Sequence, residues 1–177
     1  MPAGQWPGAA EVSRVFAQPL QGQFGGQEAT LLAHPRLRLL GFTNRGRGPL
    51  LHHGARRATP LGYAAAFASN LVQRRALGGW LQRVVFSDPR DALPFALGDF
   101  ATRRVALAAD NLGPAILASG SIPFVLQPVH HIARAPRGAY WDGGITDYHL
   151  PMPAWPTAWC CTRTSSVRWC PAGWTRA

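Results

Sequence analysis

The triplet Asp142-Gly143-Gly144 has the clearest capacity for acid–base chemistry in this sequence. It follows Ala139-Tyr140-Trp141, which is typical of a short strand, so its carboxylate would lie at a strand end. Glycines leave little side-chain bulk around that carboxylate and can adopt backbone angles closed to other residues. A carboxylate held in this way can act as a general base towards a nearby hydroxyl. The triplet is also a common turn signal, in which the Asp142 side chain would only bond the backbone beyond it.

Other side chains offer weaker arrangements. Asp147 and His149 stand two residues apart, and His130-His131 lies upstream, which together suggest a carboxylate–imidazole metal site. No recognised ligand spacing accompanies them, so we predict neither a metal nor a cofactor. Ser119 or Ser121 would need His149 to form a catalytic triad with Asp142. We expect both serines to be turn residues that bond the local backbone instead.

Two stretches carry a resemblance to a known family. Residues 114–124 contain the block Ala-Ser-Gly-Ser-Ile-Pro, and residues 138–145 contain Tyr140 followed by Asp-Gly-Gly. In this order and spacing they resemble the C-terminal part of the patatin-like phospholipases, in a bacterial branch of that family. Residues 43–48 and 76–80 also resemble this branch, so the likeness covers roughly residues 30–150.

The resemblance implies a serine acyl hydrolase with a Ser–Asp dyad, acting on phospholipids or related lipid esters. Asp142 would be the base, and Gly143 and Gly144 would complete its motif. The family carries its nucleophile in a Gly-x-Ser-x-Gly elbow preceded by a Gly-rich oxyanion segment, and none of the seven serines here has that context. By the family's spacing the elbow would precede Met1. We therefore expect a fragment that holds only the Asp half of the dyad and is inactive alone.

The last 27 residues differ in composition from the rest of the chain. Residues 151–177 hold all three cysteines (Cys160, Cys161 and Cys170), four of the seven tryptophans and no acidic residue. Shifting the reading frame by one base can turn their Trp and Cys codons into Leu and Val codons. We therefore divide the chain into a partial patatin-like domain, 1–150, and an aberrant tail, 151–177, that is out of frame.

Short apolar runs alternate with helical patterns, which favours an α/β fold. The resemblance narrows this to a three-layer patatin-like sandwich with a mostly parallel sheet that lacks its first strand. We predict strands over 37–43, 82–86, 104–107 and 139–141, and helices over 60–77 and 110–119. Asp110 is the expected N-cap of the second helix. We predict loop structure for the first thirty residues and a turn over 44–48.

The charge leaves other functional classes open. Eighteen arginines and no lysine stand against eight acidic residues, giving a formal net charge of +10. A non-catalytic module that binds anionic lipid or nucleic acid is one alternative. Because aromatic residues are not interleaved with the arginines, we do not expect nucleic acid as the partner. Another alternative is an interaction fragment that uses an open sheet edge to capture a polypeptide carrying the missing half.

The sequence also bears on location. Residues 1–7 lack the basic start and apolar run of a secretory signal, and no apolar run is long enough to span a membrane. Arg74 and Arg75 end the predicted helix 60–77, whose apolar side suits either the protein core or a lipid surface. We therefore expect a cytoplasmic or peripheral membrane protein.

Overall fold

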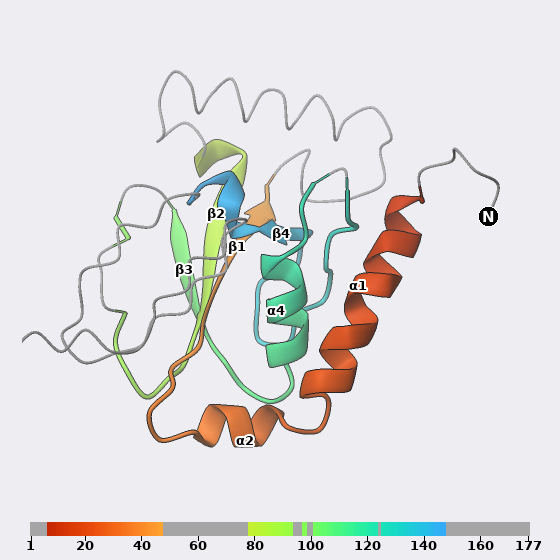
Figure 1. The fold of residues 1–177 in the computed structure, drawn as a ribbon. Helices are drawn as coiled ribbons and strands as arrows, with labels where there is room; N and C mark the ends of the chain where they lie inside the picture. The colour runs from red at the N-terminus through yellow and green to blue at the C-terminus, as the bar shows by residue number, and fades with distance from the viewer. Residues whose placement is uncertain (1–6, 48–77, 94–96, 99–100, 124, 148–177) are drawn as a thin grey trace, which may run out of the picture.

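Four strands form one mixed sheet in the order β3-β2-β1-β4 (Figure 1). The computed structural model describes residues 7–47, 78–93, 97–98, 101–123 and 125–147. The strands are β1 (Leu40–Gly46), β2 (Leu81–Ser87), β3 (Thr102–Ala106) and β4 (Tyr140–Asp142). β1 is antiparallel to both β2 and β4, whereas β2 and β3 are parallel. The α/β class is therefore confirmed, but the expected mostly parallel arrangement is wrong for the described strands.

β2 is the buried centre of the sheet. Leu81, Val84, Val85 and Phe86 are fully buried, because neighbouring strands flank β2 and other residues cover both faces. β-branched and aromatic side chains suit such a strand, and the prediction of a strand over 82–86 is confirmed. The other predicted strands are also found, with β3 beginning two residues before the expected 104–107.

β1 extends further than its sequence indicates. The expected strand over 37–43 begins at Leu40, and the turn predicted over 44–48 is wrong because the strand continues to Gly46. Asn44 and Arg45 pair with β2 on one side and with β4 on the other. Tertiary pairing thus outweighs the turn preference of Asn and Gly.

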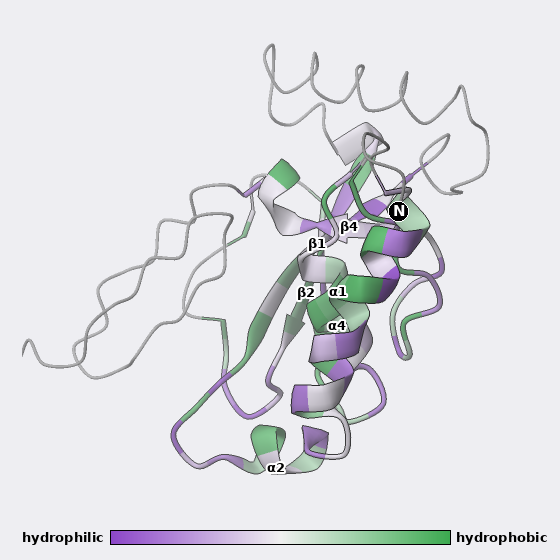
Figure 2. Cartoon of the chain, turned by 45° about the vertical axis from the view of Figure 1, so that its right-hand side comes forward, coloured by the Kyte–Doolittle hydropathy of each residue, from purple (hydrophilic) through white to green (hydrophobic). Residues whose placement is uncertain are grey.

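Two helices occupy the N-terminal region, for which the sequence predicts loop structure. They are α1 (Ala9–Phe24) and α2 (Glu28–Ala33), so that prediction is wrong. The half-buried side chains of α1 include Val12, Phe16, Leu20 and Phe24, each four residues apart, which places them on one face of the helix. Gly, Gln and an internal Pro19 obscured this spacing in the sequence. Along its length α1 carries both hydrophobic and hydrophilic segments (Figure 2).

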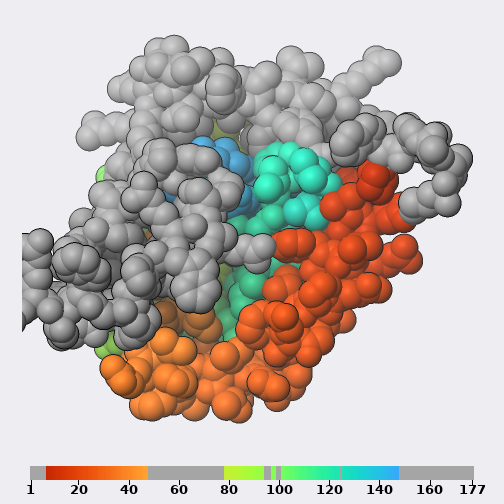
Figure 3. Space-filling model, in the orientation of Figure 1, coloured from red at the N-terminus to blue at the C-terminus, as the bar shows by residue number. Residues whose placement is uncertain are grey.

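α4 (Leu112–Ser119) lies between the sheet and α1 (Figure 1). In the space-filling view, α1 and α2 form much of the surface on this side and leave part of the α4 segment visible (Figure 3). The N-cap residue is Asn111 rather than the expected Asp110. The buried Asn111 amide bonds Ala106 and Ala108, whereas Asp110 pairs with Arg134 at 3.1 Å. An amide side chain can join the strand end to the helix because it both donates and accepts, whereas an ionised aspartate only accepts.

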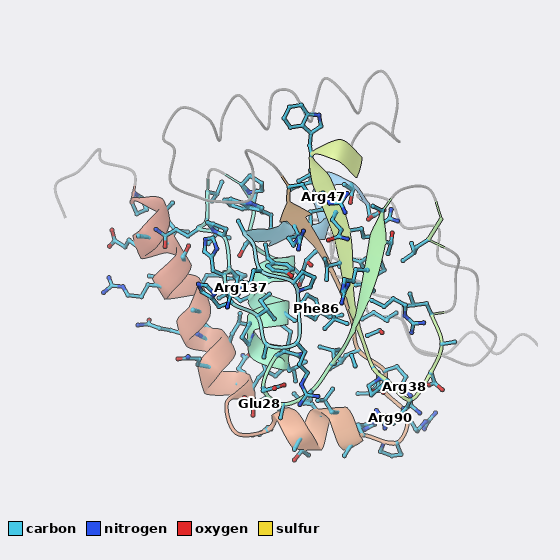
Figure 4. All side chains as sticks on the ribbon, turned by 180° about the vertical axis from the view of Figure 1, so that it is seen from behind. Glu28, Arg38, Arg47, Phe86, Arg90 and Arg137 are labelled. Atoms are coloured by element: carbon cyan, nitrogen blue, oxygen red, sulfur yellow. The ribbon has the colours of Figure 1, made fainter. Side chains whose placement is uncertain are left out.

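The main core fills the space between the sheet and α4. Phe86 and Tyr140 meet there with ring centroids 6.2 Å apart, and Figure 4 shows Phe86 in this layer. Leu81 and Trp141 form a second, smaller cluster. Residues from the last described strand thus contribute to both clusters, which anchors β4 and the Asp142 that ends it.

At the end of the sheet near α2, Asp88 and Arg90 form a partly buried ion pair, and Figure 4 shows Arg90 beside Arg38. Arg90 donates to both carboxylate oxygens of Asp88, to the carbonyl of His34 and to that of Leu37. The Arg90 bonds hold the pKa of Asp88 below its ordinary value, although burial opposes them. This pair therefore joins the segment after α2 to the end of β2.

We expect Asp88→Asn to lower the free energy of unfolding by about 1–2 kcal/mol at pH 7, because Arg90 loses its charged acceptor. The folded pKa of Asp88 is lowered, so its contribution is fully present above the unfolded value. It is lost as the pH falls through the folded value. Urea titrations at pH 7 and near pH 3 should therefore show a difference that shrinks in acid. Asp91→Asn removes the more exposed pair with Arg38 and should cost less than about 1 kcal/mol. An equal loss from both variants would contradict this.

Candidate functional site

Asp142 ends β4 and begins a 3-10 turn, Gly143–Ile145. One edge of β4 pairs with β1. On the other edge, the Asp142 amide donates to the carbonyl of Ser121 at 2.9 Å, and Tyr140 exchanges two backbone hydrogen bonds with Val129. The chain is therefore held from two sides where the carboxylate leaves it. The prediction of a strand followed by a tight turn is confirmed.

Gly143 is required by a close approach of two backbones. A Cβ at this position would lie 2.6 Å from both the Cβ and the carbonyl oxygen of Phe42 in β1. Side chains do not tolerate such distances, so only glycine lets the turn pack directly against β1. This packing sets the position from which the Asp142 side chain projects.

The Asp142 carboxylate bonds the turn that follows it. Its Oδ1 accepts a hydrogen bond from the Gly144 amide at 3.0 Å. The turn interaction predicted as the alternative to a catalytic role is therefore present. It occupies one carboxylate oxygen and orients the group, so it is compatible with proton transfer at the other oxygen.

Asp142 differs in its electrostatics from the other described aspartates. Each of the other four pairs with an arginine: Asp88 with Arg90, Asp91 with Arg38, Asp110 with Arg134 and Asp147 with Arg83. Within the described part of the chain, no side chain bonds the Asp142 carboxylate. Partial burial raises its pKa above the ordinary value, although backbone hydrogen bonds from Gly144 and Gly143 oppose the shift. A raised pKa makes this carboxylate a stronger base than an ordinary aspartate.

The nearby serines bond the backbone, as predicted. Ser121 Oγ donates to the carbonyl of Leu117 at 2.8 Å, and Ser119 Oγ donates to that of Ile116 at 2.9 Å. These bonds close the end of α4 and direct both hydroxyls to the helix. The structure thus gives neither serine the hydrogen bond to a base that an activated nucleophile needs.

The described members of the weakly indicated metal site do not form a group that could hold an ion. Asp147 is 5% exposed and its carboxylate is taken up by Arg83. His130 and His131 are exposed, with ring centroids 6.1 Å apart. Across residues 7–147, gaps excepted, no group of three His, Cys, Asp or Glu side chains could hold an ion. His149 lies outside the described residues.

Some predictions fall outside the described residues. These are the helix over 60–77 with Arg74 and Arg75, Gly48, the tail 151–177 and its three cysteines. They remain predictions.

A buried polar group beneath the Asp142 turn was missed by sequence reasoning. It comprises Asn44, Arg83, Thr146 and Asp147, which come from β1, β2 and the residues after the turn. The sequence instead predicts a turn at Asn44 and places Arg83 in the strand over 82–86. The available signal was a charged residue in the middle of the apolar run 81–87, because a buried arginine requires a partner.

Searches against protein-family models, curated proteins and solved structures found no match to this chain. A functional interpretation therefore rests on the geometry of Asp142 and on the motifs of the sequence.

Proposed function

We propose that this chain carries the acid half of a patatin-like Ser–Asp acyl hydrolase, with Asp142 as the general base. The observation that supports this most directly is the electrostatic state of Asp142. It is half-buried, has a raised pKa and bonds no described arginine, whereas each of the other described aspartates pairs with an arginine. The residues of β1, β2, β3 and α4 would then belong to a patatin-like sandwich that is incomplete at its N-terminal side.

The reaction needs a serine from a Gly-x-Ser-x-Gly elbow, supplied by a polypeptide segment outside this sequence. The serine Oγ would bond to the carbonyl carbon of an ester while Asp142 takes its proton. The proton would pass to the leaving alkoxide as the ester C–O bond breaks, giving an alcohol and an acyl-serine. Water would then attack the acyl-serine, with Asp142 again taking and returning the proton, to release the carboxylic acid.

Exposed apolar residues that follow Ser121 in the chain favour a lipid ester as substrate. Ile122 and Val125 expose 45% and 52% of their surface. They lie in the segment that Ser121 joins to Asp142 through a backbone hydrogen bond. Exposed aliphatic side chains in this segment would contact an acyl chain by burying its methylene groups.

The alternative function, a non-catalytic basic module that binds anionic lipid or nucleic acid, receives less support. Four described arginines are paired with aspartates, so these guanidinium groups are already engaged within the fold and are less available to an external anion. A module that binds anionic lipid or nucleic acid would show binding that weakens steeply with salt. None of the helices in the described segments has the length and apolar character of a membrane span.

The test begins with the DNA several hundred bases upstream of the Met1 codon and across the codons for 150–151. We expect an upstream in-frame Gly-x-Ser-x-Gly and a tail frame restored by one base. An in-frame stop directly before Met1, with an undisturbed tail frame, would contradict the proposal for this protein.

The upstream polypeptide should then be co-expressed with the full 177-residue chain and assayed on phosphatidylcholine vesicles and on p-nitrophenyl butyrate. We expect no turnover by the chain alone and turnover by the pair. Asp142→Asn should lower kcat/KM of the pair by at least about 10³-fold. Asp110→Asn, an exposed control, should leave it unchanged. Turnover by the chain alone that disappears in Asp142→Ala would contradict the proposal that the chain holds only half of the site. A fully active pair carrying Asp142→Asn would contradict the role of Asp142 as the general base.

A further inference from the structure

Asn44 lies directly beneath the Asp142 turn and is fully buried. Its Nδ2 donates to the carbonyl of Asp142 at 3.0 Å and to the carbonyl of Gly143 at 3.2 Å. Its Oδ1 accepts from the Thr146 hydroxyl at 2.9 Å. One side chain of β1 therefore contacts both ends of the turn, about a hundred residues away in sequence.

Thr146 extends the network to a buried ion pair. The Thr146 hydroxyl lies 2.9 Å from Asp147 Oδ2 as well as from Asn44 Oδ1, so its single proton can serve either acceptor. Asp147 in turn accepts from Arg83 at 2.5 and 2.6 Å. The Asn44 amide is therefore oriented by Thr146, which in turn contacts the Asp147 carboxylate held by Arg83.

The two peptide groups that Asn44 holds are those whose amides face the carboxylate. A peptide group is planar, so the carbonyl of Gly143 and the amide of Gly144 move together. The carbonyl of Asp142 and the amide of Gly143 are coupled in the same way. Gly144 donates to Asp142 Oδ1, and both amides lower the pKa of Asp142 against the effect of burial. By holding the carbonyls of Asp142 and Gly143, Asn44 thus also holds the amides of Gly143 and Gly144.

We propose that Asn44 is the positioning residue for Asp142: by binding two successive carbonyls it aims the amides that orient the carboxylate. The inference rests on the proposed function for its catalytic meaning, but the coupling between Asn44 and Asp142 is a property of the chain itself. It can therefore be measured without any enzymatic activity.

The first test is nuclear magnetic resonance on the full chain, following the Gly144 amide proton from pH 2 to pH 8. In the unmodified chain its shift should follow the ionisation of Asp142. In Asn44→Ala the amplitude should fall at least about twofold, because the amide no longer points at Oδ1. If Asn44→Ala does not fold, Thr146→Val replaces it, since this variant removes the donor to Asn44 Oδ1 and should give a smaller fall. An unchanged Gly144 titration in a folded variant would overturn the inference.

Thr43→Val is the matched control. Thr43 neighbours Asn44 on β1, is equally buried and donates to the carbonyl of Val84 at 2.8 Å. The variant loses one buried hydrogen bond, as a merely structural change would, but makes no change to the turn carbonyls. Its Gly144 titration should match that of the unmodified chain. An equal fall in amplitude would show that general loss of stability, not Asn44, controls the turn.

The second test uses the reconstituted pair. Asn44→Ala should lower kcat about 10–100-fold with KM unchanged, because misplacing a reacting group by about 1 Å costs rates of that order. If Asp142→Asn abolishes turnover while Asn44→Ala leaves kcat intact, positioning by Asn44 is wrong. If neither variant changes turnover, the proposed function fails, and the Gly144 titration still decides whether Asn44 holds the turn.

Discussion

Arg83→Met is expected to lower the free energy of unfolding by about 3–5 kcal/mol at pH 7. Arg83 is 1% exposed and binds Asp147 through two parallel hydrogen bonds, from Nε at 2.6 Å and from Nη2 at 2.5 Å. The variant would leave the Asp147 carboxylate buried opposite an apolar side chain. A buried charge that loses its counterion retains its full desolvation cost, which is why the loss exceeds that of a surface pair.

The double variant Arg83→Met/Asp147→Leu is the control for this prediction. Because it removes both charges together, it should recover much of the stability lost in Arg83→Met. Urea unfolding followed by circular dichroism of the unmodified chain, Arg83→Met, Asp147→Leu and the double variant would give four free energies of unfolding, from which the coupling between the two positions follows. A loss below about 1 kcal/mol in Arg83→Met would mean that water or another group compensates Asp147, contrary to the structure.

Sequence patterns located the elements whose signals are local. β2 contains the β-branched and aromatic run Val84-Val85-Phe86, and β4 begins with a short apolar run before Asp-Gly-Gly. The end of β1 was misjudged because Asn44 and Gly46 favour turns in isolation, whereas two neighbouring strands hold them extended. α1 was missed because Pro19 and Gly22 mask the face formed by Val12, Phe16, Leu20 and Phe24. Strand direction was not predictable because side chains alternate in the same way in parallel and antiparallel strands.

The candidate site was predictable only at its centre. Asp142 and its two glycines are adjacent in sequence, so a local pattern identifies them. The groups that determine their properties are not local: Asn44 and Phe42 come from β1, and Arg83 comes from β2. Nothing in the sequence pairs Arg83 with Asp147 rather than with another of the aspartates. That choice depends on the order of the strands, which sets the side chains that meet.

The contact between Gly143 and Phe42 gives the second large prediction. Gly143→Ala should lower the free energy of unfolding by about 3 kcal/mol, because the new methyl group would meet the Phe42 backbone, which β2 and β4 hold in place. Gly41→Ala is the control, because Gly41 precedes Phe42 on β1. Its Cβ would lie 3.7 Å from that of Phe86, an ordinary contact, so we expect a change below about 1 kcal/mol.

The two glycine variants also separate stability from the geometry of the site. If Gly143→Ala folds, the turn must have moved away from Phe42, and the bond between the Gly144 amide and Asp142 Oδ1 should weaken with it. The Gly144 amide titration would then lose amplitude, whereas Gly41→Ala would keep it. Gly143→Ala with unchanged stability and an unchanged titration would mean that β1 does not press against the turn. The close packing that positions Asp142 would then be absent, and the case for a pre-oriented base at this strand end would lose its structural support.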